Sequence, residues 1–306
     1  MAGWTDSPYR QVVKKLCPEI ICFSELISVD AIVHDNKKTL NMLKSGKSEF
    51  PLIVQLFGKN PDFFVEAGKK LEKMGAAGID INMGCPAKKV TKASYGSALL
   101  KNTPLAFEIV KKLSKSLKIP VSVKIRIGYD KYDEKSFINF VKSLEKAGAK
   151  AITIHGRTKN QEFSGKADWE PIYTAKKHLK IPVIGNGDID SDEAARKRLK
   201  DPKSQAILDG IMIGRAAFGN PWILAQTWAK LHNKKVTPAP SFHKKIPLII
   251  AHFKLSLKIH GETLGLMEMK KHLSTYLKGF ENSSKFRKEI MESKDPKAVL
   301  DILKNL

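Results

Sequence analysis

The feature that most constrains this chain is a series of seven short apolar runs, each closed by polar residues. The runs begin near residues 21, 51, 78, 121, 151, 182 and 210. Amphipathic segments lie between them, for example at 63–74, 104–117 and 136–147. Strand and helix in alternation are typical of parallel βαβ units, and runs nearly continuous in Val and Ile are typical of strands covered on both faces. The sequence therefore predicts an α/β fold, a (β/α)8 TIM barrel.

A barrel of this class has eight strands, and only seven runs are present. The chain opens at residues 1–8, Met-Ala-Gly-Trp-Thr-Asp-Ser-Pro, which read as the loop that follows a first strand. Either the first strand is truncated or the barrel closes imperfectly, and we favour the truncated start. An open gap would expose the unpaired backbone edges of the two neighbouring strands.

A domain boundary is visible near residue 240. Residues 233–247 are polar and contain three prolines, which is typical of a linker. Beyond it, apolar residues recur at helical spacing. The sequence predicts a catalytic barrel over residues 1–235 and an all-helical domain of three or four helices over residues 241–306.

The net charge of +23 suggests a polyanionic partner such as nucleic acid. The excess is spread along the chain, since residues 241–306 hold 13 Lys+Arg against 7 Asp+Glu. A lysine-rich codon composition would give the same excess without any function, so composition alone leaves both explanations open.

Cysteine usage and hydropathy narrow the class of protein. The three cysteines exclude a disulfide framework and a structural zinc site built on four thiolates, and no metal site is predicted. No run of 18 apolar residues and no signal peptide is present. We expect a cytoplasmic protein, and no membrane contact or protein partner is predicted.

Polar residues at the ends of successive parallel strands are the usual source of a barrel's active site. Those that close the predicted strands here are Gln55, Asn82, Cys85, Lys124, Arg126, His155, Arg157, Asn186, Gly187, Asp188, Gly214 and Arg215. Cys85 is a lone thiol directly after a buried strand, where it is positioned to act on a ligand.

The loops after the last two strands predict a phosphate site. Glycines let the backbone approach a ligand, and Arg215 offers a two-pronged donor to phosphate oxygens. A Gly-x-Gly-x-x-Gly fingerprint is absent, which favours a mononucleotide cofactor, flavin mononucleotide (FMN). Lys124, Gln55 and His155 would then face its ring, where a fixed cation stabilises the negative charge of the reduced form.

Taken together, these motifs resemble the tRNA-dihydrouridine synthases. The resemblance rests on Met1-Ala-Gly-x-Thr-Asp-x-Pro, Asn82-x-Gly-Cys-Pro, Lys124-Ile-Arg-x-Gly, His155-Gly-Arg-Thr, Ala167-Asp-Trp, Asn186-Gly-Asp-Ile and Met212-Ile-Gly-Arg. It runs in order from residue 1 to about 225. The stretches Gly84-Cys-Pro-Ala-Lys-Lys-Val and Gly96-Ser-Ala-Leu-Leu look most like the bacterial DusB branch.

The resemblance implies reduction of the C5–C6 double bond of a tRNA uridine, with FMN as cofactor and NADPH, or NADH, as reductant. It implies that Cys85 protonates C5 and that Asn82, Arg126 and Arg157 contact the substrate. The implied flavin contacts are Met1, Ala2, Gln55, Lys124, His155, Asn186, Gly187, Asp188, Gly214 and Arg215. The tail is expected to bind phosphates of the tRNA through a patch of lysines such as Lys270, Lys271, Lys285 and Lys288. Only the patch as a whole is predicted, since any one of these lysines on its own is better explained as part of a solvated helix face.

Two departures and two rival functions remain. The family places a strand ending in Ala-Pro before the position of Met1, and Trp4 stands where a smaller residue is common. A small-molecule FMN barrel oxidoreductase would share the phosphate loops without needing the basic tail. A catalytically disabled RNA-binding barrel would keep the tail without the flavin. The sequence does not identify which uridine is modified or the oligomeric state.

Overall fold

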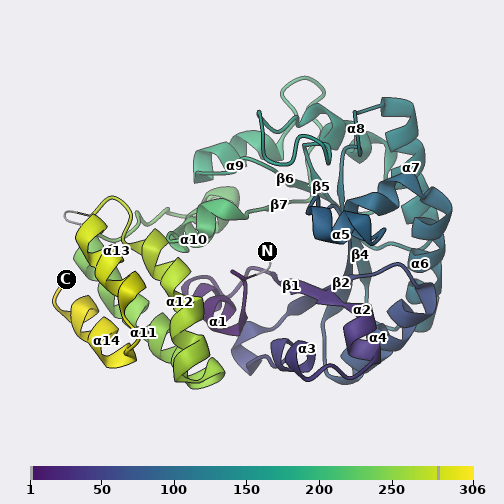
Figure 1. Ribbon diagram of the computed structural model, residues 1–306. Helices are drawn as coiled ribbons and strands as arrows, with labels where there is room; N and C mark the ends of the chain where they lie inside the picture. Colours follow the sequence, from purple (N-terminus) through teal and green to yellow (C-terminus); the bar gives the residue numbers. More distant parts are fainter. Residues whose placement is uncertain (1–2, 281–282) are drawn as a thin grey trace.

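The fold is built around a seven-stranded parallel sheet flanked by helices, as the computed structural model shows over residues 3–280 and 283–306 (Figure 1). The strands pair in sequence order from β1 to β7. Their bounds are β1 Cys22–Ser28, β2 Leu52–Phe57, β3 Gly78–Met83, β4 Val121–Arg126, β5 Ala151–His155, β6 Val183–Asn186 and β7 Gly210–Met212. All seven predicted strands are confirmed, and each begins within a residue of its predicted start.

Helices between the strands cover the outside of the sheet. Three predicted segments are confirmed as α4 (Pro61–Lys73), α6 (Thr103–Ser116) and α7 (Glu134–Lys146). The others before the tail are α1 Ser7–Leu16, α2 Val29–Val33, α3 Lys37–Met42, α5 Lys88–Lys92, α8 Glu170–His178, α9 Asp192–Leu199 and α10 Trp222–Leu231, with 3-10 turns η1 Lys47–Glu49, η2 Gly96–Lys101 and η3 Arg215–Ala217. Asn60 and Asn102 cap α4 and α6, and each is followed by a proline in the first turn.

Two of these helices end in the same device. Both α4 and α7 close with a Leu-Glu-Lys sequence, and in both a glycine at positive φ follows one residue later, at Gly75 and Gly148. Glu72 accepts backbone hydrogen bonds from Lys118 and Ile119, and Glu145 accepts the equivalent pair from Lys180 and Ile181. Glu72 thereby fixes the chain just before β4, and Glu145 fixes the chain just before β6. Both contacts lie at the amino end of the sheet.

The sheet curls into a half-barrel, and the N-terminal segment lies between its two edge strands, β1 and β7 (Figure 1). The backbone N–H of Gly3 donates to Glu25 of β1. On the other side, Trp4 stacks on Phe218 after β7 at 4.0 Å between ring centroids, and the Tyr9 hydroxyl donates to the carbonyl of Ala217 (2.7 Å). Residues 3–9 therefore contact β1 on one side and the turn that follows β7 on the other.

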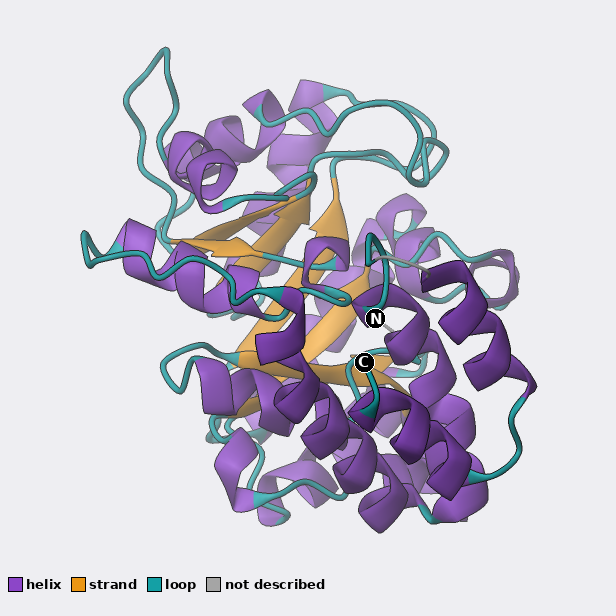
Figure 2. Ribbon diagram, turned by 90° about the vertical axis from the view of Figure 1, so that its left-hand side faces the viewer, coloured by secondary structure: helices purple, strands orange, loops and turns teal. Residues whose placement is uncertain are grey.

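The predicted helical tail is confirmed as four helices. They are α11 Phe242–His260, α12 Glu262–Tyr276, α13 Ser283–Glu292 and α14 Pro296–Lys304, and Figure 2 shows them gathered in front of the sheet. They enclose an apolar cluster of their own, separate from the barrel core, which includes Ile249, Phe253 and Leu273. The division into a barrel over residues 1–235 and a tail domain over residues 241–306 stays a proposal.

The tail is nevertheless joined to the barrel by more than its linker. Tyr9 of α1 lies against the rings of His252 and His272, at 5.9 and 5.3 Å between centroids. His260 at the end of α11 pairs with Asp6, the N-cap residue of α1, at 3.0 Å. Within residues 3–280 and 283–306, no helix is long and apolar enough to cross a membrane.

Candidate active site

Parallel pairing brings the predicted polar residues to one edge of the sheet. In the register of the strands, Asn82 lies opposite Lys124, Arg126 opposite His155, and His155 opposite Asn186. These positions end β3, β4, β5 and β6, so the carboxyl ends of four neighbouring strands contribute to one row. Met1 and Ala2, predicted as cofactor contacts, lie outside the described residues.

A buried carboxylate organises the first part of this row. Gln55 Nε2 donates to Asp80 Oδ2 (2.7 Å), and Ser122 Oγ donates to Asp80 Oδ1 (2.6 Å). Asn82 Nδ2 donates in turn to Gln55 Oε1 (2.9 Å). Burial raises the pKa of Asp80 to about 6, against these hydrogen bonds and the nearby charge of Lys124. Asp80 was not predicted as a site residue, although an acid inside the apolar run Gly-Ile-Asp-Ile was a visible signal.

The side chain of Lys124 points across the sheet to β6. Its ammonium donates to Asn186 Oδ1 (3.0 Å), and Asn186 Nδ2 donates to the carbonyl of Met212 in β7 (2.8 Å). Burial lowers the pKa of Lys124 to about 8, opposed by the charge of Asp80. Lys124 remains partly accessible, and Asn186 can occupy only one of its three N–H donors.

Cys85 is held in the loop after β3 by side chains on both sides of it. Asn82 Oδ1 accepts from the backbone N–H groups of Gly84 (3.2 Å) and Cys85 (2.9 Å). The Cys85 carbonyl accepts from the hydroxyl and the backbone N–H of Ser97 (2.9 and 3.1 Å). Cys85 is partly exposed as a residue. Asn82, predicted at the substrate edge, thus holds the cysteine loop in this structure.

Arg126 and Arg157 are both about 2% exposed, and both hold the loop that follows β5. Arg126 donates to the carbonyls of Gly84 (2.8 Å), Thr158 (2.7 Å) and Glu162 (2.8 Å). Burial and the neighbouring Arg157 lower the pKa of Arg126 to about 10. The role that these contacts give Arg126 is to fix backbone, and its predicted contact with substrate stays a prediction.

Arg157 lies on the other side of that loop. It donates to the carbonyls of Ser164 (3.1 Å) and Gly165 (2.6 Å) and forms an ion pair with Asp188 at 2.7 Å. Its remaining nitrogen is 3.3 Å from His155 Nε2. Burial and the charges of Lys124, Arg126, Arg157 and Arg215 lower the pKa of His155 to about 2, so this imidazole is neutral at physiological pH.

The two predicted phosphate loops lie side by side after β6 and β7. Gly187 has φ +125°, and a Cβ there would lie 2.7 Å from Cβ of Ala167. Asp188 accepts from Arg157, from the backbone N–H of Ala167 (2.7 Å) and from Arg215 (3.4 Å). Burial opposes its ionisation, but these bonds hold the pKa of Asp188 below its usual range. The carboxylate of Asp188 therefore connects the loops after β5, β6 and β7. An anion bound here would be contacted by the backbone N–H of Asp188 and not by its side chain.

Arg215 and an aromatic residue that sequence reasoning missed form the exposed end of the row. The Arg215 side chain is 55% exposed and its guanidinium lies 4.7 Å from the ring centroid of Phe163. Arg126 lies 5.6 Å from the same ring, and Phe163 is 55% exposed. An aromatic side chain in a long loop carries no periodic signal that could have revealed it.

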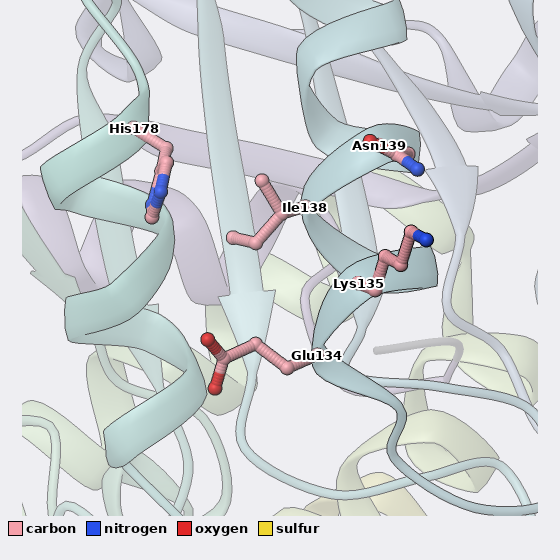
Figure 3. Close-up of a pocket in the computed structure, with 5 residues that line it drawn as sticks. All are labelled: Glu134, Lys135, Ile138, Asn139 and His178. Atoms are coloured by element: carbon pink, nitrogen blue, oxygen red, sulfur yellow. The ribbon is translucent and has the colours of Figure 1, made fainter.

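A groove on the outer helix layer contains none of these residues. Figure 3 shows Glu134, Lys135, Ile138, Asn139 and His178 around a space of about 320 Å³ between α7 and α8. A second one, of about 390 Å³, is lined by residues 114, 117–121, 148 and 150 at the amino end of the sheet. Both grooves lie away from the carboxyl ends of the strands, where the predicted site residues gather.

Comparison with known proteins places the chain among enzymes of one family. The family described as Dihydrouridine synthase (Dus) matches residues 1–306. A "Probable tRNA-dihydrouridine synthase" of Rickettsia bellii is 38% identical over 98% of this chain and 91% of its own length. A "tRNA-dihydrouridine synthase B" of Pseudomonas aeruginosa is 36% identical over 97% of this chain and 88% of its own.

Proposed function

Because the chain belongs to the dihydrouridine synthase family, and is thus an oxidoreductase, we propose that it reduces the C5–C6 double bond of uridines in tRNA to 5,6-dihydrouridine. One observation carries the chemistry. A partly exposed cysteine, Cys85, is fixed by Asn82 at the same sheet edge as Lys124 and the glycine loops after β6 and β7. We further propose FMN as the cofactor, NADPH or NADH as the reductant, and the cytoplasm as the location.

The residues at this edge fit a flavin mononucleotide. Lys124 keeps two N–H donors beyond the one that Asn186 can occupy, and it is only partly accessible, so it would hold the anionic form of the ring. Arg215 presents an exposed guanidinium, and Gly214 and Gly187 offer backbone N–H groups, to a phosphate. His155 stays neutral because of its lowered pKa. Asp188 fits less well than predicted, because its carboxylate would repel a phosphate and only its N–H would contact it.

Cys85 would supply the proton that the reaction needs. Bound FMN, reloaded by the nicotinamide reductant, would supply the hydride that C6 of the uracil receives. The Cys85 S–H bond breaks as the C5–H bond forms, and the resulting thiolate regains a proton from solvent, to which the residue is partly open. Asn82 restrains the backbone of Cys85 and so fixes where the thiol can point.

The substrate demands a further feature of the molecule. A uridine in folded tRNA must leave its stack to reach the strand ends, and phosphate contacts supply most of the affinity for nucleic acid. Of the four tail lysines predicted to supply such contacts, Lys270 donates to the carbonyl of Met291 (2.7 Å) and Lys271 pairs with Glu268. Lys285 and Lys288 are exposed on α13 and are the better candidates.

The proposal is tested by incubating the purified full-length protein with NADPH and an unmodified tRNA transcript. We expect a bound flavin spectrum, NADPH oxidation that depends on tRNA, and a mass gain of two hydrogen atoms at specific uridines. Oxidation that depends on small enones but not on tRNA would favour the small-molecule oxidoreductase. A protein that binds tRNA without flavin would be the disabled RNA-binding barrel.

A further inference from the structure

A second cluster of chemically capable side chains lies away from the strand ends, where the tail meets the N-terminal segment. Asp6 comes directly before α1, His252 lies on α11 and His272 on α12. One donor atom from each lies within 4.8 Å of the other two. No sequence motif pointed to this site, because the three residues come from opposite ends of the chain.

The two histidines are buried without the partners that buried polar atoms require. His252 is fully buried and His272 is 1% exposed. His252 Nε2 and both ring nitrogens of His272 have no hydrogen-bond partner among the described residues. Buried nitrogen atoms without a partner are costly and rare, which points to an absent ligand such as a water molecule or an ion.

The surroundings prepare both imidazoles to act as ligands. His252 Nδ1 lies 3.2 Å from the hydroxyl of Tyr276, so an N–H donated there leaves the lone pair on Nε2. His272 is packed edge-on against Trp4 (5.0 Å) and face to face with Tyr9 (5.3 Å), which fixes its plane. Burial is the main cause that lowers the pKa of His252 to about 3 and of His272 to about 4, so both rings are neutral.

The carboxylate of Asp6 completes the donor set. Its Oδ1 accepts from the backbone N–H of Tyr9 (3.1 Å), and its Oδ2 lies 3.0 Å from His260 Nε2. Each oxygen keeps a lone pair beyond these bonds. The side chain of Asp6 is 13% exposed. His260 supplies a countercharge to Asp6 when it is protonated. A metal ion, unlike a neutral water molecule, would be bound by the carboxylate as well as by both histidines.

We propose that Asp6, His252 and His272 bind one divalent transition-metal ion, with zinc the best match, at the joint between the N-terminal segment and the tail. Two imidazoles and one carboxylate are a known zinc ligand set, and water would take the fourth position. Two ligands about 2.0–2.2 Å from one zinc ion lie at most about 4.4 Å apart. The three donor atoms lie within 4.8 Å of one another, so small side-chain shifts are enough to bring them into the range of one ion. The ion would hold residues 3–9, the N-terminal segment, against α11 and α12 of the tail.

The test is zinc binding to the full-length protein without a histidine tag, treated first with a chelator and then equilibrated with a slight excess of Zn²⁺. We expect one zinc ion per chain by elemental analysis and a rise in the unfolding temperature on adding zinc. In His272→Gln and His252→Gln the affinity for zinc should fall by more than 10–100-fold, which is the usual loss when a residue that only hydrogen-bonds to a metal ligand is replaced. His232→Gln, which changes an exposed histidine at the end of α10, should bind as the wild type does.

Three results would overturn the proposal. The first is wild-type protein that retains no zinc, and the second is equal retention by the wild type and the two histidine variants. If the histidine variants fail to fold, Asp6→Asn replaces them, because asparagine keeps an oxygen that can cap α1. An Asp6→Asn protein whose unfolding temperature still rises with zinc as much as the wild type is the third contrary result.

Discussion

At the scale of single residues, the sequence located the polar side chains but not their partners. Gln55, Lys124 and His155 were predicted because each closes an apolar run. The strand register sets Gln55 opposite Asp80, Lys124 opposite Asn82 and His155 opposite Arg126, and their roles in the site stay predictions. Arg126 and Arg157 were assigned to the substrate, yet each donates to backbone carbonyls of the loop after β5. Those carbonyls are positioned by an irregular loop, which no periodicity in the sequence describes.

Asn82 provides the first prediction. In Asn82→Ala the backbone of Cys85 loses its acceptor, so we expect kcat to fall about 10²-fold, as small displacements of a reacting group commonly do, with little change in KM. Asn82→Asp is the comparison, because it keeps the oxygen that accepts from Gly84 and Cys85 and loses the N–H that donates to Gln55. A rise in KM at constant kcat in the alanine variant would instead assign Asn82 to direct uracil binding.

Asp80 provides a prediction about pH. Its pKa is raised from 3.8 to about 6, so the unfolded chain loses this proton first and the folded protein loses stability as pH rises from about 4 to 6. The shift corresponds to about 3 kcal/mol. Asp80→Asn removes that pH dependence, so the stability of the wild type relative to the variant should decline between pH 4 and 7 in denaturant titrations. A difference in unfolding free energy that stays constant over this range would mean that the pKa of Asp80 is not raised in the folded protein.

At the scale of elements, the strands and outer helices could be predicted because periodicity and caps are local. Asn60 and Asp133 accept from the first turns of α4 and α7 as their positions before each helix suggest. The loops were predictable only where glycine marks them. The loop that carries Phe163, by contrast, is held by the side chains of Arg126 and Arg157, and no local pattern in the sequence marks those hydrogen bonds.

Two glycines at positive φ give a matched test of the loop after β6. At Gly187 a Cβ would meet Ala167 at 2.7 Å and His155 at 3.0 Å, whereas at Gly165 nothing lies within 4 Å. Gly165→Ala should cost only the backbone strain, about 1–2 kcal/mol. Gly187→Ala should cost more in unfolding free energy and should weaken flavin retention during gel filtration. Equal effects of the two substitutions on flavin content would separate this loop from the cofactor.

At the scale of the whole molecule, the sequence marked the boundary near residue 240 but not what crosses it. A linker predicts few contacts between domains, yet Asp6, Tyr9 and Trp4 all contact residues of α11 or α12. Deleting residues 241–306 would therefore uncover buried surface as well as remove lysines. Substitution of surface charges tests the tail's role in binding more cleanly.

The charge prediction concerns α13. Replacing Lys285 and Lys288 by glutamine should weaken tRNA binding and reduce the slope of log K against log salt by about one for each phosphate that is no longer neutralised. The same change at Lys115 and Lys146, which lie on α6 and α7, removes equal charge from the outer layer of the barrel. Filter binding at several salt concentrations compares the pairs. If both pairs lower affinity and slope equally, the basic tail acts only through net charge.

The central claim, that Cys85 donates the proton to C5, is tested most directly by single-turnover reduction of tRNA by flavin-reduced protein. In Cys85→Ala, flavin content and flavin reduction by NADPH should be unchanged, while dihydrouridine forms about 10²–10⁴-fold more slowly, the usual contribution of a positioned general acid. Cys17→Ala, which changes a buried thiol beyond α1, should react at the wild-type rate. Wild-type turnover by Cys85→Ala would contradict the account.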